Sequence, residues 1–330
     1  MSTPRRVQIR SFAKVNLDLR VLHRRPDGFH EIRSLFHTIS LADRMRLEFN
    51  PGRGFKVDTT CPGTEIPQED NLAHRAAVAF LERAKVRGSV SIAISKSIPM
   101  GGGLGGGSSN AASVLLALPA LTGKTLPLVE LMDLAGSLGS DVPFFLLGGA
   151  AIALGRGEEL YPAPAFPALS GLLVTPGIHV STADAYRSLA RGEASASSAK
   201  IVREFSSRFV SLYPSSPRGV GDASPREFPL GSGLGVNDFE TPVFRTHPQL
   251  RAWKSKLVRT GALHAMMSGS GSSLFALYAT AEAARQAESK LPAEEVRRFR
   301  LLPQSQYRQA WRHSLHPYSN QLWPPQPHNA

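Results

Sequence analysis

The chain has 330 residues, of which 42% are hydrophobic and 19% are charged, and it contains one cysteine. This length suits about two domains, and the composition excludes a small disulfide-stapled module, a collagen-like chain and a wholly disordered chain. The 38 basic residues exceed the 26 acidic ones by a net charge of +12, which favours phosphate-bearing ligands. Because the basic residues are scattered, charge alone does not choose between a nucleotide, a nucleic acid and a solvated basic surface.

The N-terminal residues run into strand-like sequence without the apolar segment of a signal peptide, and no run of about 18 apolar residues is present. We therefore expect a cytoplasmic protein with no membrane partner. Cys61 lies between Thr60 and Pro62 in a predicted turn. We interpret it as structural, because one cysteine forms neither an internal disulfide nor a multi-cysteine zinc site.

The spacing of apolar residues predicts strands and helices in mixed order. Asp70 or Asn71 is a suitable cap for the first helix, and Gly139 suits the end of a later one. The predicted strands are residues 7–22, 29–47, 90–95 and 148–154, and the predicted helices are residues 72–88, 111–118 and 128–138. Strands mixed with isolated helices favour α+β layers over a doubly wound parallel sheet.

A proline-rich segment at residues 161–167 indicates a linker between two domains. Beyond residue 303 the chain is polar and ends in a proline-rich run, which is typical of an unstructured tail. The predicted organisation is an N-terminal domain (1–167), a C-terminal domain (168–302) with a Ser/Gly/Pro-rich loop region (192–235) around a short helix (199–209), and a tail without structure (303–330).

A glycine-rich segment joins the predicted strand 90–95 to the predicted helix 111–118. Glycines let consecutive peptide N–H groups turn toward one ligand, and the following helix N-terminus favours negative charge, so we interpret the segment as a phosphate-binding loop. The alternative is a flexible linker. No lysine follows the glycines, which excludes a Walker A motif, and a match to G-x-G-x-x-G is weak. The segment comprises Pro99, Met100, Gly101, Gly102, Gly103, Leu104, Gly105, Gly106, Gly107, Ser108 and Ser109, and it is followed by Asn110.

Ser108, Ser109 and Asn110 are residue types that cap helices, and their side chains are also suited to a phosphate oxygen or a Mg²⁺ ion. The loop resembles the second motif of the GHMP kinase superfamily, Pro-x-x-x-Gly-Leu-Gly-Ser-Ser-Ala-Ala. Its triple glycines resemble the subfamily that phosphorylates 4-diphosphocytidyl-2-C-methyl-D-erythritol in the non-mevalonate route to isoprenoid precursors. Further similar segments are the first motif (13–17 and 25–30), the catalytic segment (139–145) and the third glycine motif (267–273), so that the resemblance spans residues 7–280.

The resemblance implies a two-domain α+β fold with an N-terminal ribosomal-protein-S5-like domain, a C-terminal ferredoxin-like domain and an active site between them. It implies ATP-dependent phosphorylation of the substrate's 2-hydroxyl group, with residues 99–109 binding ATP. Mg²⁺ is expected to arrive with the nucleotide, because phosphate charge needs neutralising while the sequence offers no dedicated metal site.

By the same resemblance, Asp141 is the catalytic base toward the substrate hydroxyl. Lys14 keeps that carboxylate ionised and helps to orient the hydroxyl. Taken without the resemblance, Asp141 precedes Val142-Pro143 and is suited to capping a helix, while Lys14 is suited to the exposed face of a strand. Capping uses one carboxylate oxygen, so the two interpretations of Asp141 are compatible.

The resemblance also implies a cytosine pocket. His30 would bond the cytosine edge, and Tyr186 would stack on the ring. Phe29 stands where a tyrosine is usual, so it keeps a stacking face and loses a hydroxyl group. Asn16 and Phe36 are the expected neighbours. The alternatives are a surface histidine for His30 and a core aromatic residue for Tyr186.

Two other functions compete with this hypothesis. One is a kinase of the same superfamily that acts on homoserine or mevalonate. The other is a basic nucleic-acid-binding protein without catalysis, which the missing aromatic motif of RNA-binding sheets disfavours. We therefore expect a small-molecule substrate and ATP as ligands, no nucleic-acid partner, and a monomer or weak homodimer.

Overall fold

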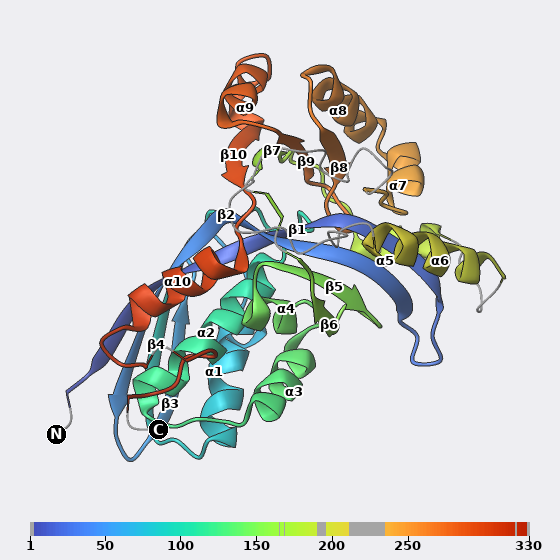
Figure 1. Ribbon diagram of the computed structural model, residues 1–330. Helices are drawn as coiled ribbons and strands as arrows, with labels where there is room; N and C mark the ends of the chain where they lie inside the picture. The colour runs from blue at the N-terminus through green and yellow to red at the C-terminus, as the bar shows by residue number, and fades with distance from the viewer. Residues whose placement is uncertain are drawn as a thin grey trace, which may run out of the picture.

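The computed structural model describes residues 3–164, 166–167, 169–189, 196–210, 235–320 and 322–328. In this part of the chain two β-sheets, one of six strands and one of four, pack with helices against them (Figure 1). The α+β class predicted from the mixed elements is confirmed.

The larger sheet is built around β1 and β2, two long antiparallel strands that bend where β-bulges interrupt their register. Before the first bulge in the chain, Val7 and Ile9 point into the N-terminal core. After Phe12, Ala13 and Val15 pack against the smaller sheet, which leaves Lys14 on the opposite face of the strand. The strands of this sheet are β1 (Arg5–Arg24), β2 (His30–Pro51), β3 (Phe55–Thr60), β4 (Gly88–Ser95), β5 (Ala150–Leu154) and β6 (Glu159–Pro162).

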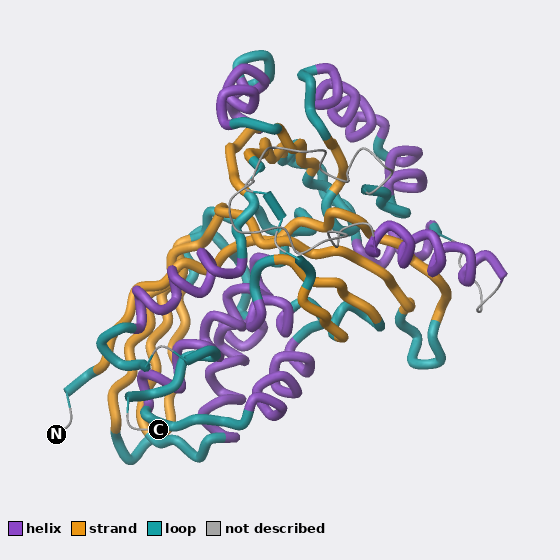
Figure 2. Tube along the Cα trace, in the orientation of Figure 1, coloured by secondary structure: helices purple, strands orange, loops and turns teal. Residues whose placement is uncertain are grey.

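Helices cover one face of this sheet (Figure 2). The side chain of Asn71 caps the first by accepting a hydrogen bond from the amide of Ala73 at 3.0 Å, as the sequence predicted. The second helix is buried at every position from Ser109 to Leu121, because helices and sheet surround it. The helices are α1 (Leu72–Arg83), α2 (Gly106–Thr122), α3 (Leu128–Leu138) and α4 (Val142–Leu147).

The smaller sheet has the strand order β10-β7-β9-β8 and is antiparallel throughout. Figure 1 shows α8 and α9 on the side of this sheet that faces away from β1 and β2. Its strands are β7 (Ser170–Val174), β8 (His264–Met267), β9 (Leu274–Tyr278) and β10 (Val296–Arg300). The helices in this half are α5 (Thr182–Ser188), α6 (Ala196–Val210), α7 (Glu240–Thr246), α8 (Pro248–Arg259) and α9 (Ala281–Glu288).

Helix α6 confirms the short helix expected at residues 199–209. Most of the surrounding loop region predicted at 192–235 falls on residues 192–195 and 211–234, which lie outside the described residues. The chain passes from one sheet to the other between β6 and β7. The domain boundary near Pro167 stays a prediction. Within the described residues, no helix has the length and apolar character needed to cross a membrane.

The prediction that residues 303–330 have no structure was wrong. Residues 304–315 form helix α10 (Gln304–Leu315), which packs against β1 and the N-terminal core. Tyr307, Trp311 and Leu315 recur every four residues, so they share one helix face, and all three are buried. Phe12 of β1 contacts the ring of Tyr307, with centroids 5.6 Å apart. The polar composition of the segment concealed this single apolar stripe.

Candidate active site

The glycine loop connects β4 to α2 and ends at the helix N-terminus. Helix α2 begins at Gly106, and its N-cap, Gly105, adopts a left-handed conformation without a side-chain cap. The expectation that Ser108, Ser109 or Asn110 caps the helix was therefore wrong. Because no side chain caps the first turn, its N–H groups remain available to an anion. The loop lines a cavity of about 370 Å³ together with Asn71 and Lys96.

Ser109 of the predicted loop set, and Asn110 directly after it, hydrogen-bond to residues of β1 and β2. The hydroxyl of Ser109 is buried and accepts a hydrogen bond from Ser11 at 2.7 Å, so it faces β1. The amide of Asn110 donates to Asp43 at 3.0 Å. Among the predicted serines, Ser108 is the one that lines the cavity.

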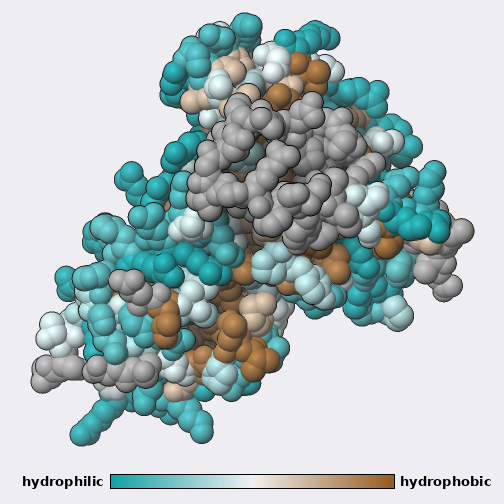
Figure 3. All heavy atoms as spheres, in the orientation of Figure 1, coloured by the Kyte–Doolittle hydropathy of each residue, from teal (hydrophilic) through white to brown (hydrophobic). Residues whose placement is uncertain are grey.

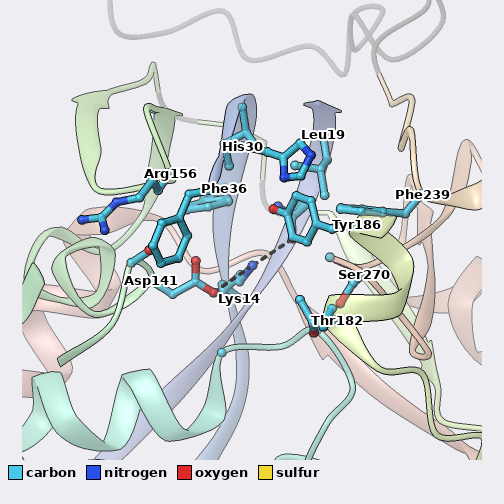
Figure 4. Close-up of a pocket in the computed structure, with 18 of the residues that line it drawn as sticks. Lys14, Leu19, His30, Phe36, Asp141, Arg156, Thr182, Tyr186, Phe239 and Ser270 are labelled. Atoms are coloured by element: carbon cyan, nitrogen blue, oxygen red, sulfur yellow. Dashed lines mark hydrogen bonds and ion pairs between the residues drawn. The ribbon is translucent and has the colours of Figure 1, made fainter. Parts of the chain in front are cut away.

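Lys14 and Asp141 come together, as the resemblance implied. The ammonium of Lys14 lies 3.3 Å from a carboxylate oxygen of Asp141 and donates to the side-chain oxygen of Asn16 at 2.9 Å (Figure 4). It also sits 4.5 Å from the centre of the Phe36 ring. Lys14 is buried and Asp141 is partly exposed, so one partner is fixed while the other faces the pocket.

Asp141 occupies the N-cap position of α4, but its side chain makes no capping hydrogen bond. The capping interpretation is therefore wrong in this structure. Pro143 stands in the first turn of that helix, where a missing N–H removes one of the groups that a cap would satisfy. The carboxylate is thus directed to Lys14.

The glycine loop touches Lys14 directly. The backbone amide of Lys14 donates to the carbonyl of Leu104 at 3.0 Å. A Cβ atom on Gly105 would lie 3.3 Å from Cγ of Lys14 and 2.9 Å from the Phe145 ring, so this glycine permits the close approach. Gly103 and Gly105 line both the loop cavity and a second cavity of about 880 Å³ that contains Lys14 and Asp141.

The third glycine motif closes the other side of the loop. The hydroxyl of Ser268 donates to the carbonyl of Gly103 at 3.0 Å. Asn237 holds this motif in place by donating to the carbonyls of Met267 and Gly269, both at 2.8 Å. The side chain of Asn237 thus holds the third glycine motif, and Ser268 of that motif contacts the loop of the N-terminal domain.

Aromatic residues line the outer part of the larger cavity (Figure 4). The rings of His30 and Tyr186 stack with centroids 4.8 Å apart. Burial and the positive charge of Arg24 lower the pKa of His30. Burial, with a smaller effect of the Asp141 charge, raises the pKa of Tyr186 to about 12.

Phe29 is half exposed in the turn between β1 and β2, and the guanidinium of Arg156 lies 4.9 Å from its ring centre. The predicted substrate residues Asn16, Phe29, His30, Phe36 and Tyr186 all line the larger cavity.

Sequence reasoning missed several residues of the two cavities. They are polar or cationic side chains outside the recognised motifs: Arg24, Arg156, Thr182 and Arg187 in the larger cavity and Asn71 and Lys96 in the loop cavity. Lys96 follows the predicted strand 90–95 and precedes the glycines, which was a usable signal. The others come from the end of β1, from turns and from helix ends, whose position depends on tertiary packing.

Comparison with known proteins supports the family resemblance found in the sequence motifs. Residues 71–149 match the family model of the GHMP kinases N terminal domain, and residues 229–297 match that of the GHMP kinases C terminal domain. The two-domain fold implied by the resemblance is confirmed, and the chain is a GHMP kinase in its fold and its motifs.

Similar proteins of known name indicate which family of GHMP kinases the chain resembles. A 4-diphosphocytidyl-2-C-methyl-D-erythritol kinase of Solibacter usitatus is 46% identical over 98% of both chains. One of Geobacter metallireducens is 38% identical over 84% of this chain and 92% of its own. The crystal structure of a 4-(cytidine 5'-diphospho)-2C-methyl-D-erythritol kinase superposes with a TM-score of 0.69 at 36% identity, covering 89% of this chain and 98% of that one. The chain belongs to the 4-diphosphocytidyl-2-C-methyl-D-erythritol kinase family.

Proposed function

We propose that this chain transfers the γ-phosphoryl group of ATP to the 2-hydroxyl of 4-diphosphocytidyl-2-C-methyl-D-erythritol, giving the 2-phosphate and ADP. One observation carries the proposal: the loop cavity and the larger cavity meet at Gly103 and Gly105, beside the Lys14–Asp141 pair. A phosphate held by the loop would therefore face a hydroxyl group held near Asp141. Phosphoryl transfer requires this arrangement of donor, acceptor and charge.

The N-terminus of α2 and the peptide groups of residues 101–107 would hold the triphosphate of ATP, which GHMP kinases use. Within the described residues, no group of three His, Cys, Asp or Glu side chains is arranged for a metal ion. Mg²⁺ would therefore be bound mainly by the phosphates, with the Ser108 hydroxyl as the protein ligand that lines the cavity. When bound, the ion neutralises charge on the transferring phosphoryl group.

Asp141 would accept a hydrogen bond from the 2-hydroxyl and take its proton as the bond to phosphorus forms. Lys14 would act through position and charge, because its ammonium is buried and is held by both Asn16 and Asp141. A fixed cation at this point keeps the carboxylate turned toward the acceptor and offsets negative charge that develops during transfer.

The cytidine part of the substrate would bind between the aromatic residues of the outer cavity. Tyr186 and Phe29 supply ring faces, and His30 supplies a hydrogen-bonding edge. Arg24, Arg156 and Arg187 line the same cavity, so cations surround the space where a diphosphate would lie.

The size and lining of the larger cavity favour this substrate over homoserine or mevalonate. A small aliphatic alcohol needs neither stacking rings nor three arginines, whereas a cytidine diphosphate derivative uses both. Thermal unfolding with added cytidine diphosphate tests the choice. We expect stabilisation by this nucleotide that is lost in Tyr186→Ala and His30→Ala; equal stabilisation of all three proteins, or none, contradicts the proposed pocket.

We propose further that the protein acts in the cytoplasm as a monomer or weak homodimer and has no nucleic-acid or membrane partner. Size-exclusion chromatography with light scattering over a range of concentrations tests the assembly. A stable oligomer that persists on dilution contradicts it.

A further inference from the structure

A groove of about 1030 Å³ lies between β1 and α10, apart from both cavities described above. Its walls are cationic: Arg10 on β1, Arg300 at the end of β10 and Arg312 on α10 all line it. None of its lining residues is an aspartate or glutamate within the described part of the chain. Figure 3 shows mainly hydrophilic side chains over α10.

The positive charge of this groove comes from residues near both ends of the sequence. Residues 1–17 contain four basic and no acidic residues, and residues 296–330 contain five arginines and no acidic residue. Folding brings these two segments together when α10 packs against β1. Three of these basic residues, Arg10, Arg300 and Arg312, meet at the groove.

Two arginines of this region oppose each other directly. Arg10 on β1 is the register partner of Arg44 on β2, and both side chains are exposed. Like charges at opposite positions of a strand pair are destabilising. The pKa of Arg10 is lowered by burial and by the charges of Arg44 and Arg300. An anion in the groove would offset the repulsion between Arg10 and Arg300, which both line it.

The groove also exposes an open strand edge. The amide of Arg6 donates to the hydroxyl of Tyr318 at 3.2 Å, on the side of β1 away from β2. Because alternate residues of an antiparallel strand present their peptide groups to the same side, those of Gln8 and Arg10 face outward as well. No backbone partner for these outward groups is found among the described residues before the amide of Lys14 bonds Leu104. Residues 7–13 span roughly 23 Å.

We propose that this groove binds an extended acidic segment of another protein, which adds as a strand to the edge of β1 and pairs its carboxylates with Arg10, Arg300 and Arg312. The open edge supplies main-chain hydrogen bonds, and the arginines supply the preference for acidic side chains. The face of α10 that lines the groove adds Gln306, Gln309 and His313, which are polar and can adapt to different partners.

Other occupants fit the groove less well. A second copy of this chain would bring the same positive charge to the edge. Nucleic acid binding of this kind uses exposed aromatic rings for stacking, but Phe12 and Trp311 at the groove are buried. A membrane surface would need exposed large apolar side chains, and neither residues 5–13 nor α10 carries one.

Fluorescence anisotropy with the full-length protein tests the proposal. The probe is a labelled peptide of about nine residues that alternates Glu and Val, which is long enough to cover the open edge. We expect Arg10→Glu, and separately Arg312→Glu on the other wall, to weaken binding by about tenfold or more. Arg53→Glu, a charge-matched change in the exposed turn after β2, should stay within about twofold of the parent. Kinase turnover should be unchanged in all three variants, which also shows that they fold.

Two further probes make the outcome decisive. A peptide with every second backbone amide methylated cannot pair along a strand edge and should lose binding. Equal loss with Arg53→Glu would show a general charge effect and overturn the proposal, as would full binding of the methylated peptide. A single-stranded RNA of equal charge that displaces the peptide and binds more tightly would also overturn it, in favour of a polyanion site.

Discussion

Replacing Gly103 with alanine tests whether the third glycine motif holds the phosphate loop by close contact. Gly103 has a φ of +74°, and a Cβ there would lie 2.1 Å from the carbonyl oxygen of Ser268 and 2.8 Å from its carbonyl carbon. Gly101 is the matched control in the same loop. Its φ is +68°, but a Cβ there would meet only His179, at 3.8 Å.

Both substitutions place an alanine in a left-handed backbone conformation, but only Gly103→Ala also forces a contact with Ser268. A left-handed alanine costs about 1–2 kcal/mol at either position. At position 103 the backbone of Ser268 must also move by roughly 1 Å to reach ordinary contact distance, and forced packing of this kind costs about 1–3 kcal/mol. Asn237 opposes the movement through its two hydrogen bonds to the same segment. Because a displacement of about 1 Å at a reacting centre can lower the rate by about 10²-fold, we expect that additional loss of kcat/KM for ATP in Gly103→Ala relative to Gly101→Ala.

The assay is steady-state ADP release at varied ATP, with a urea unfolding curve for each variant. The structure predicts a clear separation of the two variants in kcat/KM. Equal activity of Gly103→Ala and Gly101→Ala would refute the close-contact reasoning, and so would activity of Gly103→Ala near that of the parent.

Three further predictions concern other parts of the molecule. Asp141→Asn should lower kcat by about 10²–10⁴-fold and leave ATP binding unchanged, since it removes the proton acceptor; near-normal turnover would exclude the proposed role. Trp311→Ala should lower the urea-derived free energy of unfolding by about 3–5 kcal/mol, because Trp311 is buried in the core; a loss under about 1 kcal/mol would mean that α10 is dispensable. Burial lowers the pKa of His37 from 6.5 to about 4. As the pH falls, the unfolded state therefore binds a proton before the folded state does. The free energy of unfolding should fall by about 3 kcal/mol between the two pKa values, 6.5 and about 4. His37→Leu should reduce that pH dependence, and an unchanged slope would contradict the assignment.

The sequence motifs identified the central residues of the site because these residues stand within the motifs or next to a glycine turn. Lys14 and Asp141 are far apart in the chain, yet their pairing followed from the family resemblance and is seen at 3.3 Å. The sequence-based prediction that Asp141 caps a helix was wrong, because the orientation of its carboxylate depends on the buried ammonium of Lys14. Ser109 shows the same effect, since its contact with Ser11 arises from packing α2 against β1.

Helix α10 shows where reasoning from composition fails. Its sequence is polar, with arginines and glutamines between three apolar residues, and prolines stand on both sides. One apolar residue per turn is enough for a helix when the core offers a matching surface. Here the Phe12 ring contacts Tyr307, whose hydroxyl donates to the backbone carbonyl of Phe145. The pairing of that surface with Tyr307 is a long-range contact that no local pattern encodes. The arginines of the larger cavity were missed for the same reason.

The most direct test of the central claim is ADP release by the purified protein with one acceptor at a time. The acceptors are 4-diphosphocytidyl-2-C-methyl-D-erythritol, homoserine and mevalonate, each at equal concentration with ATP and Mg²⁺. The account predicts turnover with the cytidylated erythritol that is abolished by Asp141→Ala, and no turnover with the other two. Turnover with homoserine or mevalonate and none with the cytidylated compound would contradict it.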